Sequence, residues 1–104
     1  MASESTTADR MVLINAVRGL TASARSARAL LAVGSPDHDF YLGVEAAAAE
    51  VLHPESITAR PPDWLDRESL FFREGFLVTS ADLAGLSASG HVPVAFHLPR
   101  RALR

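Results

Sequence analysis

The fold of this protein is decided by residues 8–33, which read ADRMVLINAVRGLTASARSARALLAV. Apolar residues recur along this stretch with alternating spacings of four and three, at Leu13, Val17, Leu20, Ala24, Ala27 and Leu31. This heptad pattern predicts one amphipathic helix that packs against other helices. The small side chains of Ala24 and Ala27 would let a partner helix approach closely, and Gly19 marks another candidate close contact.

The predicted first helix has signals at both ends. Residues 1–7 are polar, so we expect a disordered lead-in, and Thr6 with Asp9 approximates a capping box at the start of the helix. Gly34 is a helix-stop signal, and Pro36 cannot continue the helix.

A second helix is predicted from Pro36 to about Leu52. Ser35 is a suitable N-cap, proline is favoured in the first turn, and the nearby Asp37 and Asp39 suit the positive end of a helix dipole. The short connection between the two helices predicts an antiparallel hairpin.

The third predicted helix carries most of the aromatic residues. Residues 55–62 form a linker ending in two prolines, after which Asp63 is expected to cap a helix over residues 64–74. Its large side chains would close the core over the alanine-rich hairpin.

The pattern changes after Gly75. Residues 76–79 are predicted to be extended, residues 81–87 a brief helix, and residues 92–98 a strand because their apolar residues alternate. The predicted fold is therefore mainly α, with a small extended or β element at the C-terminal end and an α+β fold as the alternative. Its parts are the lead-in, one domain over residues 8–98, and a basic tail over residues 99–104.

The composition narrows the class of protein. The chain has 104 residues, a net charge of −2 and no cysteine, which fits one small domain without disulfides or thiolate metal sites. It has no recognisable signal peptide and no apolar run of membrane-spanning length, so we expect a cytoplasmic protein. All ten basic residues are arginines, which we interpret as the codon bias of a GC-rich bacterium.

The first helix also provides the candidate interaction residues. Arg18, Arg25 and Arg28 form a basic row, complementary in sign to Glu45 and Glu50 of the second helix. The first helix is too long for the second to cover, so either the third helix or a second copy of the chain must cover the rest. We therefore expect a homodimer, with Ala24 and Ala27 among its contact residues.

Glu50 and His53 have the Glu-x-x-His spacing of di-iron helical bundles. A complete site needs two such pairs, so a dimer would have to supply the second. The position of His53 at the end of its helix is well explained by a favourable interaction with the helix C-terminus, without a metal. A dimeric metal protein or enzyme is thus one alternative, although no cofactor is expected.

Arg100, Arg101 and Arg104 raise a second alternative, a small DNA-binding transcriptional regulator. Residues 77–86 resemble the first helix of a helix-turn-helix, and residues 90–98 are similar to the wing of small excisionase-like proteins. The sequence departs from that pattern because only Ser87, Ala88 and Ser89 stand where the recognition helix should be.

The sequence as a whole favours a non-enzymatic module that interacts with proteins or regulates them through helix surfaces. It contains no phosphate-binding glycine loop and no nucleophile elbow, so nothing in it supports catalysis. A homodimer, with a further protein partner, is the expected assembly. Nucleic acid is kept only as the alternative.

Overall fold

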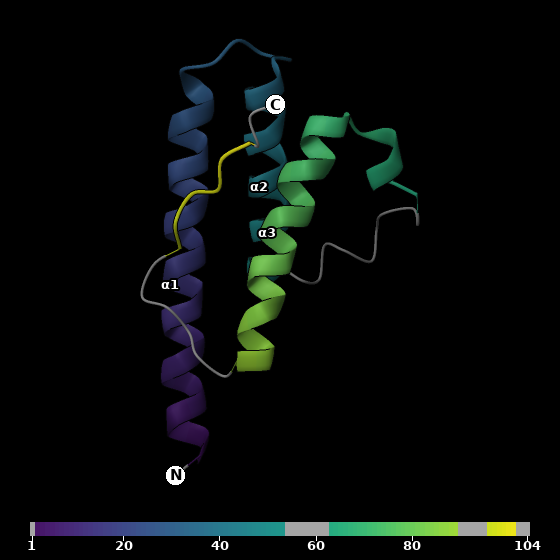
Figure 1. Ribbon diagram of the computed structural model, residues 1–104. Coiled ribbons are helices and arrows are strands. Elements are labelled where there is room, and N and C mark those ends of the chain that lie inside the picture. The colour runs from purple at the N-terminus through teal and green to yellow at the C-terminus, as the bar shows by residue number, and fades with distance from the viewer. Residues whose placement is uncertain (1, 54–62, 90–95, 102–104) are drawn as a thin grey trace.

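The protein is built from three α-helices and a single 3₁₀ turn within the residues that the structure describes (Figure 1). The computed structural model describes residues 2–53, 63–89 and 96–101, and the side chains of residues 10–53, 63–85 and 96–101 within them. The elements are α1 (Ala2–Ala29), α2 (Pro36–Leu52), the 3₁₀ turn η2 (Leu65–Arg67) and α3 (Leu70–Ser89). The predicted mainly α fold is confirmed.

Helix α1 buries the middle of its predicted seam. Val17, Leu20 and Ala24 are almost completely buried, as the heptad pattern predicts. The helix starts at Ala2, so residues 2–7 are helical and do not form the predicted disordered lead-in.

Helix α1 also ends at Ala29, four residues earlier than predicted. The Leu30 and Leu31 amides donate to carbonyls only three residues back, which replaces the α-helical pattern by a tighter turn. Gly34, with a φ of 85°, then reverses the chain just before α2, where glycine is favoured because it has no Cβ.

Helix α2 begins as its sequence predicts. The side chain of Ser35 accepts a hydrogen bond from the His38 amide, and Pro36 occupies the first turn. The buried face of α2 carries Phe40, Val44, Ala47 and Ala48. Because this face is wide, α2 can contact helices on two sides.

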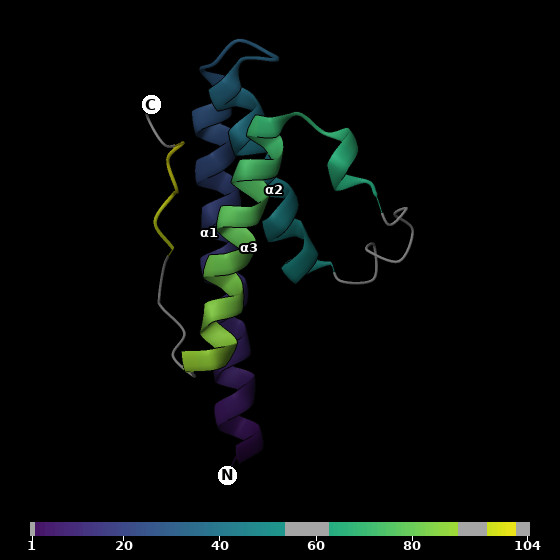
Figure 2. The same cartoon turned by 45° about the vertical axis from the view of Figure 1, so that its right-hand side comes forward.

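Helix α2 is the central element, since α1 and α3 both pack against it. Helix α1 runs antiparallel to α2, which confirms the predicted hairpin (Figures 1 and 2). Helix α3 runs parallel to α2, because it returns to the start of α2 before descending beside it. The core joins Leu20 and Ala24 of α1 to Phe40 and Val44 of α2.

The predicted third helix over residues 64–74 is wrong in its boundaries. Residues 65–67 form only the turn η2. Asp63 lies just before this turn, where it forms an ion pair with Arg67 and does not cap a helix. The chain then extends at Glu68, and α3 starts at Leu70. Its N-cap is Ser69, whose hydroxyl accepts a hydrogen bond from the Phe72 amide at 3.2 Å.

The predictions for residues 76–79 and 81–87 are corrected as well. Both stretches belong to α3, which continues through Gly75 without a break. Gly75 is therefore a helix-interior residue, and neither an extended segment nor a separate short helix follows it.

Gly43 and Gly75 form the closest approach between α2 and α3. A Cβ atom on Gly43 would overlap the backbone carbonyl of Phe72, and one on Gly75 would overlap the backbone carbonyl of Phe40. Each helix thus presents a glycine to the backbone of the other, which only residues without a side chain permit. By contrast, a Cβ on Gly19 would meet no atom within 4 Å, so Gly19 is not the close contact that the sequence suggested.

The aromatic residues gather around this crossing. The Trp64 ring meets Phe72 and Phe76 edge to face, at centroid distances of 6.1 and 5.1 Å. Phe76 is buried, and on α2 the Phe40 and Tyr41 rings make a similar contact at 5.5 Å. Such pairs add to the stability gained from burial alone.

The C-terminal segment covers part of the seam on α1. Residues 92–95 of the predicted strand lie outside the described residues, and residues 96–101 have no regular secondary structure. Phe96 and Leu98 pack against the cluster that contains Leu20 and Ala24. This segment, drawn in yellow in Figures 1 and 2, runs beside α1.

Replacing Gly43 or Gly75 by alanine is expected to lower the free energy of unfolding by about 2–3 kcal/mol, because the methyl group meets rigid backbone. Gly19→Ala is the matched control and should raise it by up to ~1 kcal/mol, because the site is open and alanine favours the helix. Urea unfolding followed by circular dichroism measures all three. Equal behaviour of Gly19→Ala and Gly75→Ala would contradict the close crossing.

Candidate functional site

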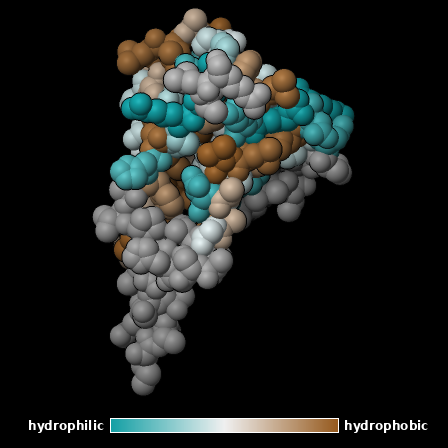
Figure 3. Space-filling model, in the orientation of Figure 1, coloured by the Kyte–Doolittle hydropathy of each residue, from teal (hydrophilic) through white to brown (hydrophobic). Residues whose placement is uncertain are grey.

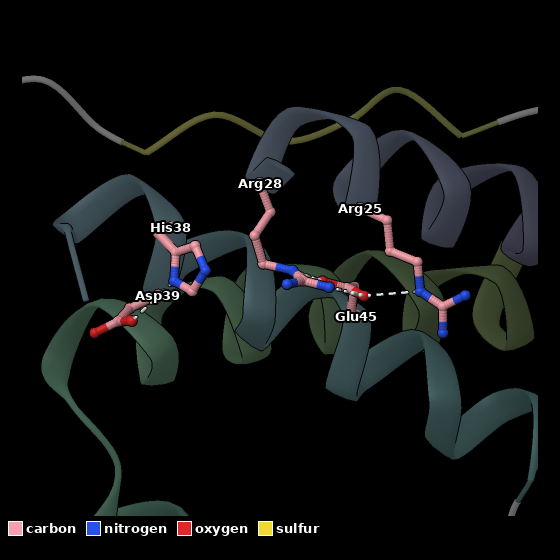
Figure 4. A network of polar contacts seen from close by, with 5 residues as sticks. All are labelled: Arg25, Arg28, His38, Asp39 and Glu45. Carbon is pink, nitrogen blue, oxygen red and sulfur yellow. Dashed lines mark hydrogen bonds and ion pairs between the residues drawn. The ribbon is translucent and has the colours of Figure 1, made fainter. Parts of the chain in front are cut away.

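The predicted basic row divides into paired and exposed members. Arg28 binds Glu45 of α2 through two hydrogen bonds, Nε to Oε2 at 2.6 Å and a terminal nitrogen to Oε1 at 3.3 Å. Arg25 reaches the same carboxylate, Nε to Oε1 at 3.1 Å (Figure 4). Arg18 is exposed. Two of the three arginines therefore join α1 to α2 within one chain.

The two arginines differ in their surroundings. The side chain of Arg28 is 30% exposed and that of Arg25 is 69% exposed. The hydrogen bond to Glu45 raises the pKa of the Arg28 guanidinium above its ordinary value. Arg28 is thus the main partner of Glu45, and Arg25 adds a weaker, solvent-exposed contact.

The predicted contact alanines lie on the inner side of α1. Ala24 is completely buried in the core cluster with Phe40 and Val44, and Ala27 is partly buried. The small side chain of Ala24 therefore serves packing within the chain.

Glu50 and His53 lie in the last turn of α2 and at its C-cap. The backbone amide of His53 donates to the Ala49 carbonyl at 2.8 Å, which ends the helix, and its side chain is exposed. Across the described residues, no three His, Cys, Asp or Glu side chains come together as a metal site.

Acidic residues at the start of α2 tie three parts of the chain together. Arg101 of the C-terminal segment binds Asp37 at 2.6 Å and lies 5.4 Å from the centre of the Phe71 ring of α3. Asp39 accepts a hydrogen bond from the Ser69 hydroxyl at 3.1 Å.

His38 lies between Asp37 and Asp39 in the sequence, and its side chain is buried. Its Nδ1 atom is 3.5 Å from Oδ1 of Asp39 (Figure 4). These polar residues thus connect the N-terminal ends of α2 and α3 to the C-terminal segment, and their role is structural.

The predicted nucleic-acid residues are not equivalent. Arg101 is engaged by Asp37 and Phe71, Arg100 is exposed, and Arg104 lies outside the described residues. The stretch that resembles a first helix-turn-helix helix belongs to the continuous α3. The described helices therefore include no separate recognition helix after it.

A cleft of about 320 Å³ opens between the second halves of α2 and α3. Small and apolar side chains form most of its lining, and Glu50 and Ser80 are its polar members. Its α2 wall consists of Ala47, Glu50 and Val51, and its α3 wall of Ser80, Leu83 and Ala84.

An exposed apolar row runs along α3, and at its end Ala84 borders the cleft between α3 and α2. Leu70 is 69% exposed and Leu77 is 56% exposed, and Ala81 and Ala84 continue the row. Successive positions are seven, four and three residues apart, which places them on one side of a helix. Hydrophobic side chains also reach the surface in the middle of the face shown in Figure 3. We call these four residues the α3 row.

The α3 row was missed at the level of sequence. Its signal was present in the spacing of Leu70, Leu77 and Ala84, but the expected break at Gly75 divided it between separate elements. A single helix over residues 70–89 is needed before these residues share a face.

None of the protein-family models, curated proteins or solved structures compared with this chain matches it. The helices within the described ranges also lack the combined length and apolar character that a membrane crossing requires. The geometry therefore offers an exposed apolar row and an adjoining cleft as the candidate site.

The Glu45 contacts can be separated by double-mutant cycles. We expect a coupling free energy of about 1 kcal/mol between Arg28 and Glu45, because that pair is doubly hydrogen-bonded and partly buried. The Arg25–Glu45 cycle should give less than ~0.5 kcal/mol, because Arg25 is largely in solvent. Alanine variants and urea unfolding measure both, and a larger coupling for Arg25 would contradict this assignment.

Arg101→Ala is expected to release the C-terminal segment and lower the free energy of unfolding by about 1 kcal/mol, since it removes both the ion pair and the ring contact. Arg100→Ala is the control, because Arg100 is exposed, and should change stability by less than ~0.5 kcal/mol. Amide hydrogen exchange at Phe96 and Leu98 should speed up only in Arg101→Ala. Unchanged exchange there would show that Arg101 does not anchor the segment.

Proposed function

We propose that this protein is a non-enzymatic interaction module with a regulatory role in the bacterial cytoplasm, and that it acts as a homodimer through helix surfaces. The observation that carries the proposal is the α3 row. Large contiguous apolar patches on the surface of a monomeric protein commonly mark a site that binds another protein.

The character of α3 supports this proposal. Helix α3 buries Phe76 and Thr79 against the rest of the protein and exposes Leu70 and Leu77 on another side. Surface helices usually carry polar residues on the side away from the core, whereas this side of α3 carries two large leucines. The outward side of α3 is therefore suited to a second protein surface.

The distribution of charge points the same way. Arg25 and Arg28 of the predicted contact row are satisfied within the chain by Glu45. The four residues of the α3 row are uncharged, and Glu74 lies on the same side of α3, between Leu70 and Leu77. The apolar row is thus a better contact surface than the arginines.

Helix α1 adds a smaller apolar surface. Met11 and Val12 are exposed, and the N-terminal part of α1 projects beyond the ends of α2 and α3 (Figures 1 and 2). Neither α2 nor α3 extends along that projecting part.

The test is site-specific photo-crosslinking in the producing cells, with a photoreactive amino acid at position 77. We expect one main adduct, at about twice the 11.1 kDa mass of the chain. The same amino acid at Ser26, an exposed position of α1, is the control and should give little adduct.

The possible results separate the two parts of the proposal. No adduct from position 77 would refute the interaction module. An adduct with a different protein would support the module and refute the homodimer.

A further inference from the structure

We infer that the C-terminal segment, residues 96–101, is an internal ligand that occupies a binding site for an extended peptide, and that a segment of a different protein binds there in its place. The partner segment carries a large apolar residue, a second apolar residue two positions later and an arginine three positions after that. This surface is separate from the α3 row, so the inference goes beyond the proposed function and does not rest on it.

The C-terminal segment contacts the helices through some of its side chains and turns others to solvent. Phe96 and Leu98 pack against the core cluster, and Arg101 reaches the start of α2. The intervening His97 and Arg100 are exposed. An extended peptide is recognised in this way, because the side chains that point inward determine specificity and those between them face outward.

The surface beneath the segment is built from all three helices. Its apolar part comes from α1 and α2, and its end near Arg101 combines a carboxylate of α2 with an aromatic ring of α3. The segment runs beside α1 across this surface (Figures 1 and 2). We call the receiving residues the segment site: Leu20, Ala24, Phe40, Val44, Asp37 and Phe71.

The acidic end of the segment site fits an arginine. Nε of Arg101 lies 2.6 Å from Oδ1 of Asp37, and its guanidinium carbon lies 5.4 Å from the centre of the Phe71 ring. A planar guanidinium can bind a carboxylate and contact a ring together, whereas a lysine ammonium is a compact point charge. The side chain of Asp37 is 49% exposed, so an arginine from another protein can reach it.

The segment does not hold the helices together. Helices α1 and α2 meet directly in the core cluster, and α2 and α3 meet directly at Gly43 and Gly75. The segment lies outside both of these contacts. It can therefore leave the site while the three helices stay assembled, which is the behaviour of a ligand.

The attachment of the segment to the chain sets a threshold for any competitor. A tethered ligand has an effective concentration on the order of millimolar at its site. The same segment from a second copy makes the same contacts, so at micromolar protein it loses by about 1,000-fold. The occupant is therefore a different protein whose segment binds more tightly than free residues 96–101, and the C-terminal segment is autoinhibitory.

The first experiment titrates the full chain with a blocked synthetic peptide of residues 96–101 and follows the backbone NMR signals of Leu20 and Ala24. Arg101→Ala should bind this peptide about 5-fold more tightly than the unsubstituted chain, because its own segment has lost the ion pair and the ring contact. Arg100→Ala is the matched control. It should bind the peptide as the unsubstituted chain does, because Arg100 is exposed.

The second experiment tests whether the peptide occupies the segment site. With the Arg101→Ala chain, a peptide that carries alanine in place of its last arginine should bind about 5-fold more weakly. Adding Asp37→Asn to that chain should remove most of this difference, because the carboxylate that receives the arginine is gone. A merely structural role of Asp37 would lower stability without changing the dependence of binding on the arginine of the peptide.

Three results would overturn the inference. They are no binding to Arg101→Ala at millimolar peptide, equal affinity of Arg101→Ala and the unsubstituted chain, and an Arg101→Ala chain that circular dichroism shows to be unfolded. The last result would make the segment part of the core. All three are distinct from failure of the proposed function, which is an absence of any photo-adduct at position 77.

Sedimentation equilibrium of the full chain tests the identity of the occupant. We expect Arg101→Ala to leave the association state unchanged, because a second copy does not supply the segment. A dimer that dissociates in Arg101→Ala and persists in Arg100→Ala would show that two copies exchange their C-terminal segments, and would overturn the assignment to a different protein.

Discussion

The close approach of α2 and α3 at Gly43 and Gly75 is the constraint on which the rest of the structure depends. Each glycine lies against the backbone of the opposite helix, so neither position accepts a side chain without separating the two helices. The cost of placing glycine within a helix is about 1 kcal/mol at each position, and the packing at this crossing must offset it.

The short distance between α2 and α3 determines where the large side chains go. Because the helices meet through glycine, Phe72 and Phe76 pack beside the crossing, and Trp64 covers them with two edge-to-face contacts. Only one side of α3 is used in this way. Leu70 and Leu77 therefore remain outside, and the surface we propose for pairing follows from the same contact that organises the core.

Polar contacts complete the arrangement by tying its parts to α2. Glu45 holds α1 through Arg28, Asp37 holds the C-terminal segment through Arg101, and Asp39 holds the start of α3 through Ser69. All three carboxylates belong to the central helix. Arg25, Arg28 and Arg101, which looked available for partners in the sequence, are thus engaged within the chain, while the apolar row on α3 is not.

The sequence alone determined the features that depend on neighbouring residues. The seam of α1 and the Ser35–Pro36 start of α2 were predictable, because helical spacing and capping are local properties. The role of Gly75 was not, since glycine ends some helices and lies inside others, and only the backbone of α2 against it distinguishes the two cases. The pairing of Arg28 and the exposure of Leu77 likewise depend on which helix lies opposite, so the tertiary structure decided them.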